Sequence, residues 1–275
     1  MQKQIAVVFD SAGTLLHMYR VAKEADSGQI TENIESTLLV AQRRGRALMV
    51  LHIDNGTILS ADPDTSVIDF IDENNVSIGI SCSNGQITAE QAYEVIKGSN
   101  VTVGAVQEVL CWVRRRCPNI FYIASGLIVD VVNNDVPYVL STGGRLYGNT
   151  QRMIQELKER GVDTYVASGD SIQNLKRLVQ SIDIPIEDVY DIANTHEKER
   201  IVQQLKERYD TVLMVGDGMN DILALRAADV GVVTVQQGDD RPVELKKAAD
   251  VVIDDIINVV DVVDELIAGK RESST

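Results

Sequence analysis

Residues 5–10 read Ile-Ala-Val-Val-Phe-Asp, five apolar residues followed by a carboxylate. An unbroken apolar run of this kind is typical of a strand buried on both faces, as in the interior of a parallel sheet. In open α/β sheets, ligands bind outside the carboxyl ends of the strands. We therefore expect Asp10, which ends this run, to face a binding site.

The second half of the chain alternates between helical and strand-like segments. Apolar Met153, Ile154 and Leu157 share one helical face, and short apolar strands separate the helical segments. Repeated strand–helix units predict an α/β fold with a doubly wound, Rossmann-like parallel sheet. We expect helices at 150–160, 171–180, 195–208, after Asn220 and at 256–267, and strands at 164–167, 211–215, 230–234 and 251–253.

Residues 16–142 mix strands and helices differently, and we interpret them as an α+β domain inserted into the first one. The core would then consist of residues 1–15 and 143–275. Gly143, Gly144 and Gly148 fit no nucleotide-binding fingerprint and predict a plain loop. Within the insert we expect strands at 48–53, 76–80, 120–123 and 136–140, and helices at 88–97 and 106–116, the first with a Thr88/Gln91 capping box.

Composition limits the classes of partner. The 275 residues carry 26 Lys and Arg against 41 Asp and Glu, a formal net charge of −15. Such a chain is repelled by nucleic acids and anionic membranes, so we expect neither as a partner. No apolar run approaches the roughly 18 residues that span a bilayer. Cys82, Cys111 and Cys117 match no zinc spacing and predict reduced thiols in a cytoplasmic protein.

Three separated segments carry residues suited to phosphoryl chemistry. They are 10–14 (Asp-Ser-Ala-Gly-Thr), 168–170 (Ser-Gly-Asp), and Lys198 followed by 216–221 (Gly-Asp-Gly-Met-Asn-Asp). A strand-end aspartate can attack phosphorus, and converging carboxylates favour Mg²⁺. Hydroxyl and ammonium groups can hold the oxygens of a transferring phosphoryl group. Together these segments predict a phosphoryl-transfer site.

The three segments resemble those of the haloacid dehalogenase-like superfamily, over residues 4–14 and roughly 145–255. They are most similar to the phosphorylation domain of P-type ATPases. In those pumps a lysine is followed by an apolar residue at +4, Leu at +7 and Gly-Asp-Gly-x-Asn-Asp from +18. Lys198, Val202, Leu205 and Gly216 stand at these offsets.

The resemblance implies a core of the superfamily's type with an inserted cap domain, and a role for each matching residue. Asp10 would be the nucleophile, with Lys198 as its catalytic partner. The substrate would be a phosphorylated small molecule or a nucleotide. The Mg²⁺ ligands would be Asp10, the Ala12 carbonyl, Asp217 and Asp221, and the phosphoryl-binding residues would be Ser168, Gly169, Lys198 and Asn220.

One departure from the family pattern changes the expected activity. Most phosphatases of the superfamily carry a second Asp two residues after the nucleophile as a general acid and base, and here that residue is Ala12. Alanine transfers no proton, and general acid–base catalysis is worth roughly 10²–10⁴-fold in rate. We therefore expect a Mg²⁺-dependent phosphohydrolase, phosphatase or ATPase-like, that is slow or selective for good leaving groups.

Two other functions stay open at this stage. The first is a regulatory protein that binds phosphate or a nucleotide without efficient turnover. The second is a phosphonoacetaldehyde hydrolase-like enzyme, since those enzymes share the Asp-x-Ala-Gly-Thr pattern of residues 10–14. The second function needs a Schiff-base lysine in the insert, where the available lysines are Lys23 and Lys97.

Overall fold

The computed structural model describes residues 4–117, 120–170, 172–238 and 241–269. The chain forms two compact units, one comprising residues up to Met18 and from Arg145 onwards, the other Tyr19–Gly144. The sequence placed the divisions after residue 15 and before residue 143. Strands β2 (Leu16–Glu24) and β7 (Asp135–Leu146) contribute residues to both units.

The first unit is built on a six-stranded sheet in the order β12-β11-β10-β1-β8-β9. All its pairs are parallel, and β1 lies between β10 and β8. Every residue of β1 is buried, as its apolar run predicts. The strands are β1 (Ile5–Phe9), β8 (Asp163–Ala167), β9 (Val189–Tyr190), β10 (Thr211–Gly216), β11 (Val230–Thr234) and β12 (Val251–Ile253).

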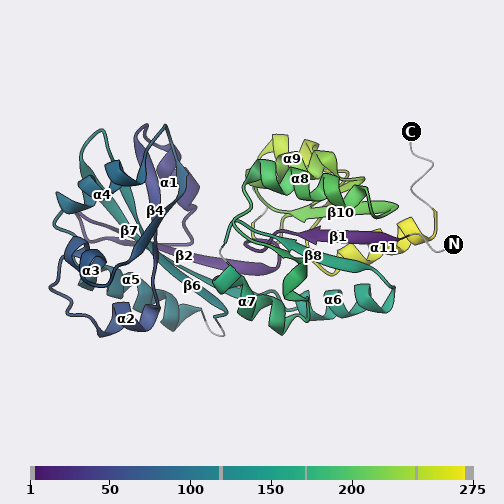
Figure 1. The fold of residues 1–275 in the computed structure, drawn as a ribbon, viewed down its shortest axis with the longest axis horizontal. Helices are drawn as coiled ribbons and strands as arrows, with labels where there is room; N and C mark the ends of the chain where they lie inside the picture. The colour runs from purple at the N-terminus through teal and green to yellow at the C-terminus, as the bar shows by residue number, and fades with distance from the viewer. Residues whose placement is uncertain (1–3, 118–119, 171, 239–240, 270–275) are drawn as a thin grey trace. The chain divides into compact units, whose positions relative to one another are not determined.

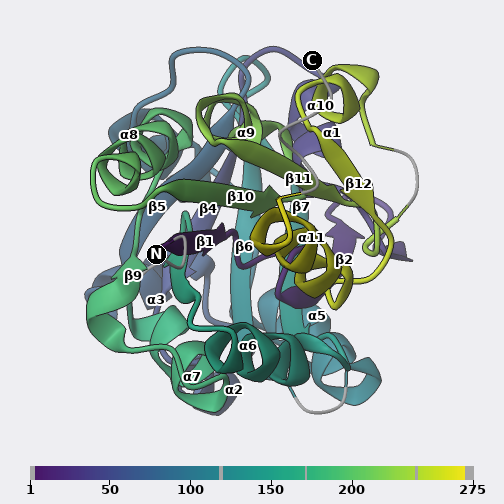
Figure 2. The same ribbon diagram turned by 90° about the vertical axis from the view of Figure 1, so that its right-hand side faces the viewer.

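Helices cover both faces of this sheet, which confirms the predicted doubly wound α/β fold (Figures 1 and 2). On one face, Val202 of α8 and Leu225 of α9 pack with Ala6 and Val8 of β1 in a common core. On the other face, α11 packs against α6. The helices are α6 (Thr150–Glu159), α7 (Ile172–Ser181), α8 (Thr195–Lys206), α9 (Ile222–Ala227), α10 (Val243–Lys247) and α11 (Asn258–Ile267).

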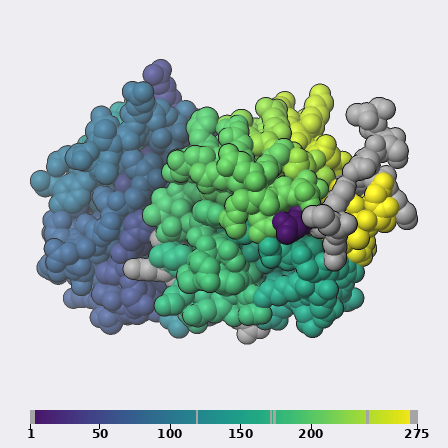
Figure 3. All heavy atoms as spheres, turned by 45° about the vertical axis from the view of Figure 1, so that its right-hand side comes forward, coloured from purple at the N-terminus to yellow at the C-terminus, as the bar shows by residue number. Residues whose placement is uncertain are grey.

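On the face that Figure 3 shows, other elements cover most of β1, whose residues are all buried. In the space-filling view, only a small purple patch from the first described residues shows at the surface of this unit (Figure 3). At the carboxyl end of this strand Asp10 is also buried, with 4% of the residue exposed. A carboxylate placed there needs positively charged partners or a metal ion.

The second unit is a six-stranded antiparallel sheet in the order β3-β2-β7-β6-β4-β5, with its own apolar core. The predicted Thr88/Gln91 capping box at the start of α4 is present. Strands β2 and β3 and helices α1 to α3 were not expected from the sequence. The elements are β3 (Ile30–Glu32), α1 (Ser36–Ala41), β4 (Arg46–His52), α2 (Asn55–Ser60), α3 (Val67–Glu73), β5 (Ser77–Ser83), α4 (Ala89–Lys97), α5 (Val103–Arg116) and β6 (Tyr122–Asp130).

The loop predicted at Gly143 and Gly144 is wrong, because both glycines pair with β6 as part of β7. A Cβ atom on Gly143 would lie 2.6 Å from Cγ1 of Val113 in α5. The glycine therefore serves close packing of a helix on the sheet rather than a turn.

Candidate active site

The three segments singled out in the sequence end neighbouring strands of one sheet. Asp10 follows β1, Ser168 follows β8, and Asp217 follows β10. Because β8 and β10 flank β1 in parallel, their carboxyl ends meet at one edge. The sheet thus brings Asp10 together with side chains that lie more than 150 residues away in the chain.

Lys198 joins two of the aspartates. Its ammonium nitrogen lies 2.5 Å from Oδ1 of Asp10 and 2.7 Å from Oδ1 of Asp221, and the lysine side chain is fully buried. A capping box between Asn194 and Glu197 fixes the start of α8, so that Lys198 stands in the first turn. A buried ammonium without such partners would carry a large desolvation penalty, and two carboxylates offset it.

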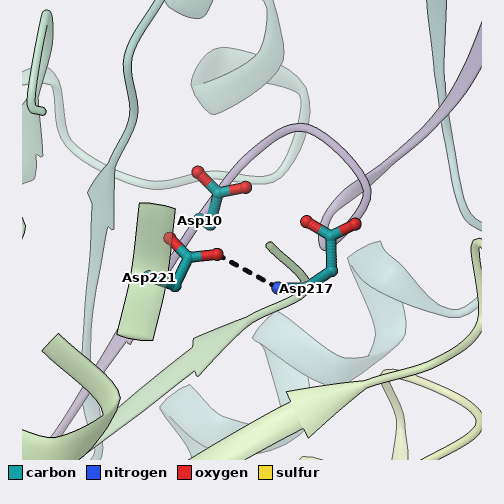
Figure 4. Close-up of side chains that lie close together, drawn as sticks. All are labelled: Asp10, Asp217 and Asp221. Carbon is teal, nitrogen blue, oxygen red and sulfur yellow. Dashed lines mark hydrogen bonds between the residues drawn. The ribbon is translucent and has the colours of Figure 1, made fainter. Parts of the chain in front are cut away.

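Both carboxylate oxygens of Asp221 accept hydrogen bonds. Its Oδ2 accepts hydrogen bonds from the backbone N–H groups of Asp217 (3.1 Å) and Gly218 (3.0 Å), and its Oδ1 accepts from Lys198. A Cβ atom on Gly216 would lie 2.5 Å from the same Oδ2. Figure 4 shows the bond from the Asp217 backbone and the three aspartates side by side. Asp221 therefore fixes both the loop and the position of Lys198.

Asp217, the third aspartate, lies directly against Gly13. Its φ is +84°, and a Cβ atom there would lie 2.0 Å from Oδ2 of Asp217. Only glycine supplies both the left-handed backbone and the space. The loop after β1 therefore passes too close to Asp217 to carry a side chain at residue 13.

Burial governs the ionisation of the nucleophile candidate. The pKa of Asp10 is raised to about 8. Desolvation is the largest cause, the Lys198 ammonium acts against it, and the Asp221 and Asp217 carboxylates add to the rise. For Lys198, desolvation lowers the pKa, but the negative charges of Asp10 and Asp221 outweigh it and raise the pKa above its ordinary value. Lys198 is therefore a permanent positive charge at this site.

The cluster fits a hard divalent cation. Asp10, Asp217 and Asp221 are all buried, and each offers a carboxylate oxygen within 4.8 Å of the others. Converging carboxylate oxygens of this kind are the donors that suit Mg²⁺. Both oxygens of Asp221 already accept hydrogen bonds, which favours Asp10 and Asp217 as direct ligands.

The predicted phosphoryl-binding residues differ in burial. Ser168 is buried beside Asp10's neighbour Ser11, with the two Oγ atoms 2.7 Å apart. Gly169 is exposed at the end of β8. Asn220 is also exposed. Its side chain turns back toward Gly218, because a Cβ atom on Gly218 would lie 2.3 Å from Oδ1 of Asn220. In the described part of the chain no hydrogen bond links Asn220 to the carboxylate cluster.

Two contacts at the site were missed by sequence reasoning. A guanidinium nitrogen of Arg241 lies 2.5 Å from Oδ2 of Asp217. The Gln236 side chain donates to the Thr14 carbonyl (2.7 Å) and so holds the loop after β1. Both residues follow β11 in a segment that contains no recognisable motif. The only available signal was the position of β11 beside β10 in the parallel sheet, which places the segment after β11 at the same edge.

The insert lysines considered for a Schiff base are both engaged in ion pairs. The ammonium nitrogen of Lys23 lies 2.5 Å from Glu108, and that of Lys97 lies 4.0 Å from Glu94. The contacts give no support to phosphonoacetaldehyde hydrolase chemistry.

Comparison with known proteins decides the family. A model of haloacid dehalogenase-like hydrolases matches residues 6–229, which include all three motif segments. The chain belongs to this family. The membership confirms the resemblance drawn from the motifs, and it identifies the chain as a hydrolase. As a haloacid dehalogenase-like hydrolase, the protein is expected to act on phosphorylated substrates.

Relatives of this haloacid dehalogenase-like hydrolase fall into two groups. A Methanocaldococcus jannaschii protein described as a soluble P-type ATPase-like phosphatase is 32% identical over 270 residues, covering 97% of this chain and 96% of that protein. A copper-transporting ATPase of Helicobacter felis is 28% identical over 247 residues, covering 90% of this chain but 30% of the pump. This hydrolase therefore matches only part of a pump.

Among solved structures, the catalytic domain of the CPx-ATPase CopB-B is similar to this hydrolase. It shares 17% identity, covers 95% of this chain and 90% of its own, and superimposes with a TM-score of 0.46. Across the described residues, no helix has the length and apolar character needed to cross a membrane.

Proposed function

We propose that the chain is a Mg²⁺-dependent phosphohydrolase that acts through an aspartyl phosphate on Asp10. The observation that carries this proposal is the fully buried Lys198, held between Asp10 and Asp221 at the carboxyl edge of the sheet. A lysine fixed against a strand-end aspartate is placed to neutralise charge on a phosphoryl group bound there. The phosphatase description of the M. jannaschii relative supports the same reading.

The roles follow from position. Asp10 would attack phosphorus, and Lys198 and the buried Ser168 would bind the phosphoryl oxygens, with Gly169 and Asn220 contributing from the exposed rim. Asp10, the Ala12 carbonyl and Asp217 would hold Mg²⁺, with Asp221 orienting Lys198 and the loop. A bound Mg²⁺ would supply positive charge to the phosphoryl oxygens and keep the Asp10 carboxylate ionised.

Ala12 sets the expected limits of the reaction. With no carboxyl group at this position, no proton reaches the leaving group from there, and the aspartyl phosphate lacks that base for its hydrolysis. Acyl phosphates, anhydrides and aryl phosphates would react faster than alkyl esters. Accumulation of the phosphorylated protein would follow from slow hydrolysis.

The same residue favours one rival function, a protein that binds phosphate or a nucleotide and turns it over only at background rate. The two functions share the site and differ in the covalent step. Trapping the phosphorylated protein separates them.

The test is intact-mass spectrometry of acid-quenched protein after incubation with Mg²⁺ and, in turn, ATP, acetyl phosphate and p-nitrophenyl phosphate. A gain of one phosphoryl group, absent from Asp10→Asn, is the expected result. No adduct and no released phosphate from any donor would favour the binding protein. Release of phosphate without an adduct would contradict the argument from Ala12.

A further inference from the structure

Arg241 is a cationic side chain at the carboxylate cluster to which the family pattern assigns no role. It lies between β11 and α10, and its guanidinium contacts Oδ2 of Asp217 at 2.5 Å. Both side chains are largely buried, with 14% and 12% of their surface exposed. The Nε atom of Arg241 is buried and has no hydrogen-bond acceptor among the described residues.

The contacted oxygen is also the atom against which Gly13 packs. A Cβ on Gly13 would lie 2.0 Å from Oδ2 of Asp217, the oxygen that accepts from Arg241. The guanidinium therefore lies next to the loop formed by Ala12 and Gly13. This is the loop from which the usual proton donor is missing.

Charge balance shows why the guanidinium would move. Among the described residues, the cluster of Asp10, Asp217 and Asp221 already contacts two cations, Lys198 and Arg241. A divalent cation bound to Asp217 would compete with Arg241 for Oδ2 and make the cluster net positive. An arginine released at that point carries five donors that match the oxygens of an anion.

We propose that Arg241 is a substrate-binding residue. Its guanidinium releases the Asp217 carboxylate and binds the anionic leaving group of the substrate. The inference rests on the proposed phosphohydrolase function. In the step it serves, an Asp10 oxygen forms a bond to phosphorus while the bond from phosphorus to the leaving oxygen breaks. The electron pair stays on that oxygen, which departs as an anion bound by Arg241 and takes no proton.

Binding of two phosphonates that resist hydrolysis tests the exchange. Methylenediphosphonate carries a second charged group where methylphosphonate has only a hydrogen on carbon. We expect Arg241→Gln to weaken calorimetric binding of methylenediphosphonate by about 10- to 100-fold in the presence of Mg²⁺. The affinity of Arg241→Gln for methylphosphonate should fall by less than about 3-fold. Arg241→Lys should recover part of the affinity for methylenediphosphonate, because lysine keeps the charge without the bidentate geometry.

A second titration uses Mg²⁺ alone. Removal of the competing guanidinium should tighten Mg²⁺ binding to Arg241→Gln by about 5-fold. The matched control is Arg160→Gln, which breaks another arginine–aspartate pair of the same unit, with Asp264 at 2.7 Å, and should change neither titration.

Equal losses for both phosphonates, or unchanged binding of both, would overturn the proposal. Weaker Mg²⁺ binding to Arg241→Gln would also overturn it, since Arg241 would then support Asp217 rather than compete for it. Neither ligand reacts, so these outcomes do not depend on turnover. Absence of both an adduct and released phosphate in the trapping experiment would reject the proposed function, and the binding result would still stand.

Discussion

The Lys198 ammonium nitrogen lies 2.5 Å from Oδ1 of Asp10, a contact that joins residues 188 positions apart in the chain. It links the end of β1 to the first turn of α8. Lys198 is fully buried, and its charge compensates carboxylates that the fold places away from water. The same contact therefore serves both the stability of this unit and its proposed chemistry.

Replacing Lys198 by Met should destabilise the protein strongly. The change leaves Asp10 and Asp221 buried without their counter-charge, and loss of one partner from a buried ion pair costs about 3–5 kcal/mol. The measurement is urea unfolding in the presence of a chelator. Lys206→Met is the matched control in the same helix, because Lys206 pairs with Asp229 at the half-exposed surface and should cost less than about 1 kcal/mol.

Replacing Ala12 by Asp should raise the turnover of alkyl phosphate esters by up to about 10²–10⁴-fold, because it supplies the missing general acid. Steady-state release of phosphate from a series of esters with leaving groups of rising basicity measures the effect. Ala12→Asn is the control of similar size without a transferable proton. An equal gain in both variants would show that shape, and not proton transfer, limits the wild-type rate.

The pKa of Asp10 predicts a pH-dependent stability in the presence of a chelator. Burial raises this pKa from 3.8 to about 8, so the folded chain keeps a proton that the unfolded chain releases above about pH 4. The Asp10 contribution to the free energy of unfolding should therefore be fully present below about pH 4. It should decline as the pH rises to about 8 and then level off.

Asp10→Asn should remove this contribution, so that the difference in stability between variant and wild type changes with pH over that window. Urea unfolding at several pH values in chelator measures it. Excess Mg²⁺ should flatten the wild-type profile, because a bound cation favours the ionised carboxylate. Parallel profiles for wild type and variant would show that Asp10 is not the titrating group.

Replacing Gly13 by Ala should weaken Mg²⁺ binding by at least about 10-fold, because the new methyl group would displace Asp217 from a position 2.0 Å away. Calorimetric titration with Mg²⁺ checks this. Gly161→Ala has the same kind of left-handed backbone, φ +70°, with open space around the Cβ position. It should lose some stability but keep its Mg²⁺ affinity, and a loss equal to that of Gly13→Ala would assign the effect to backbone strain alone.

The parallel sheet of the first unit could be predicted from local pattern. The apolar run of residues 5–9 and the repeated helix–strand spacing after residue 150 correspond to strands and helices that differ by a few residues from those expected. Buried strands and amphipathic helices leave a strong signal because one face or both must be apolar. The insert was harder, since polar and apolar residues follow no regular period along β2 and the sheet order joins strands far apart in sequence.

The chemistry of the site was also visible in the sequence, because Asp10, Ser168, Lys198 and Asp217 stand in motifs that end or precede apolar strands. Only the tertiary structure decided how these groups meet. It placed both oxygens of Asp221 in hydrogen bonds, and it brought Arg241 onto Asp217.

The reason for this division is physical. A motif records which residue types follow a strand, and strand periodicity is local information carried by neighbouring side chains. Hydrogen bonds and ion pairs between separate strand ends depend on the order of strands in the sheet and on the path of each loop. The sequence by itself therefore determined that this hydrolase carries an aspartate-rich edge, and the fold alone decided which cation faces each aspartate.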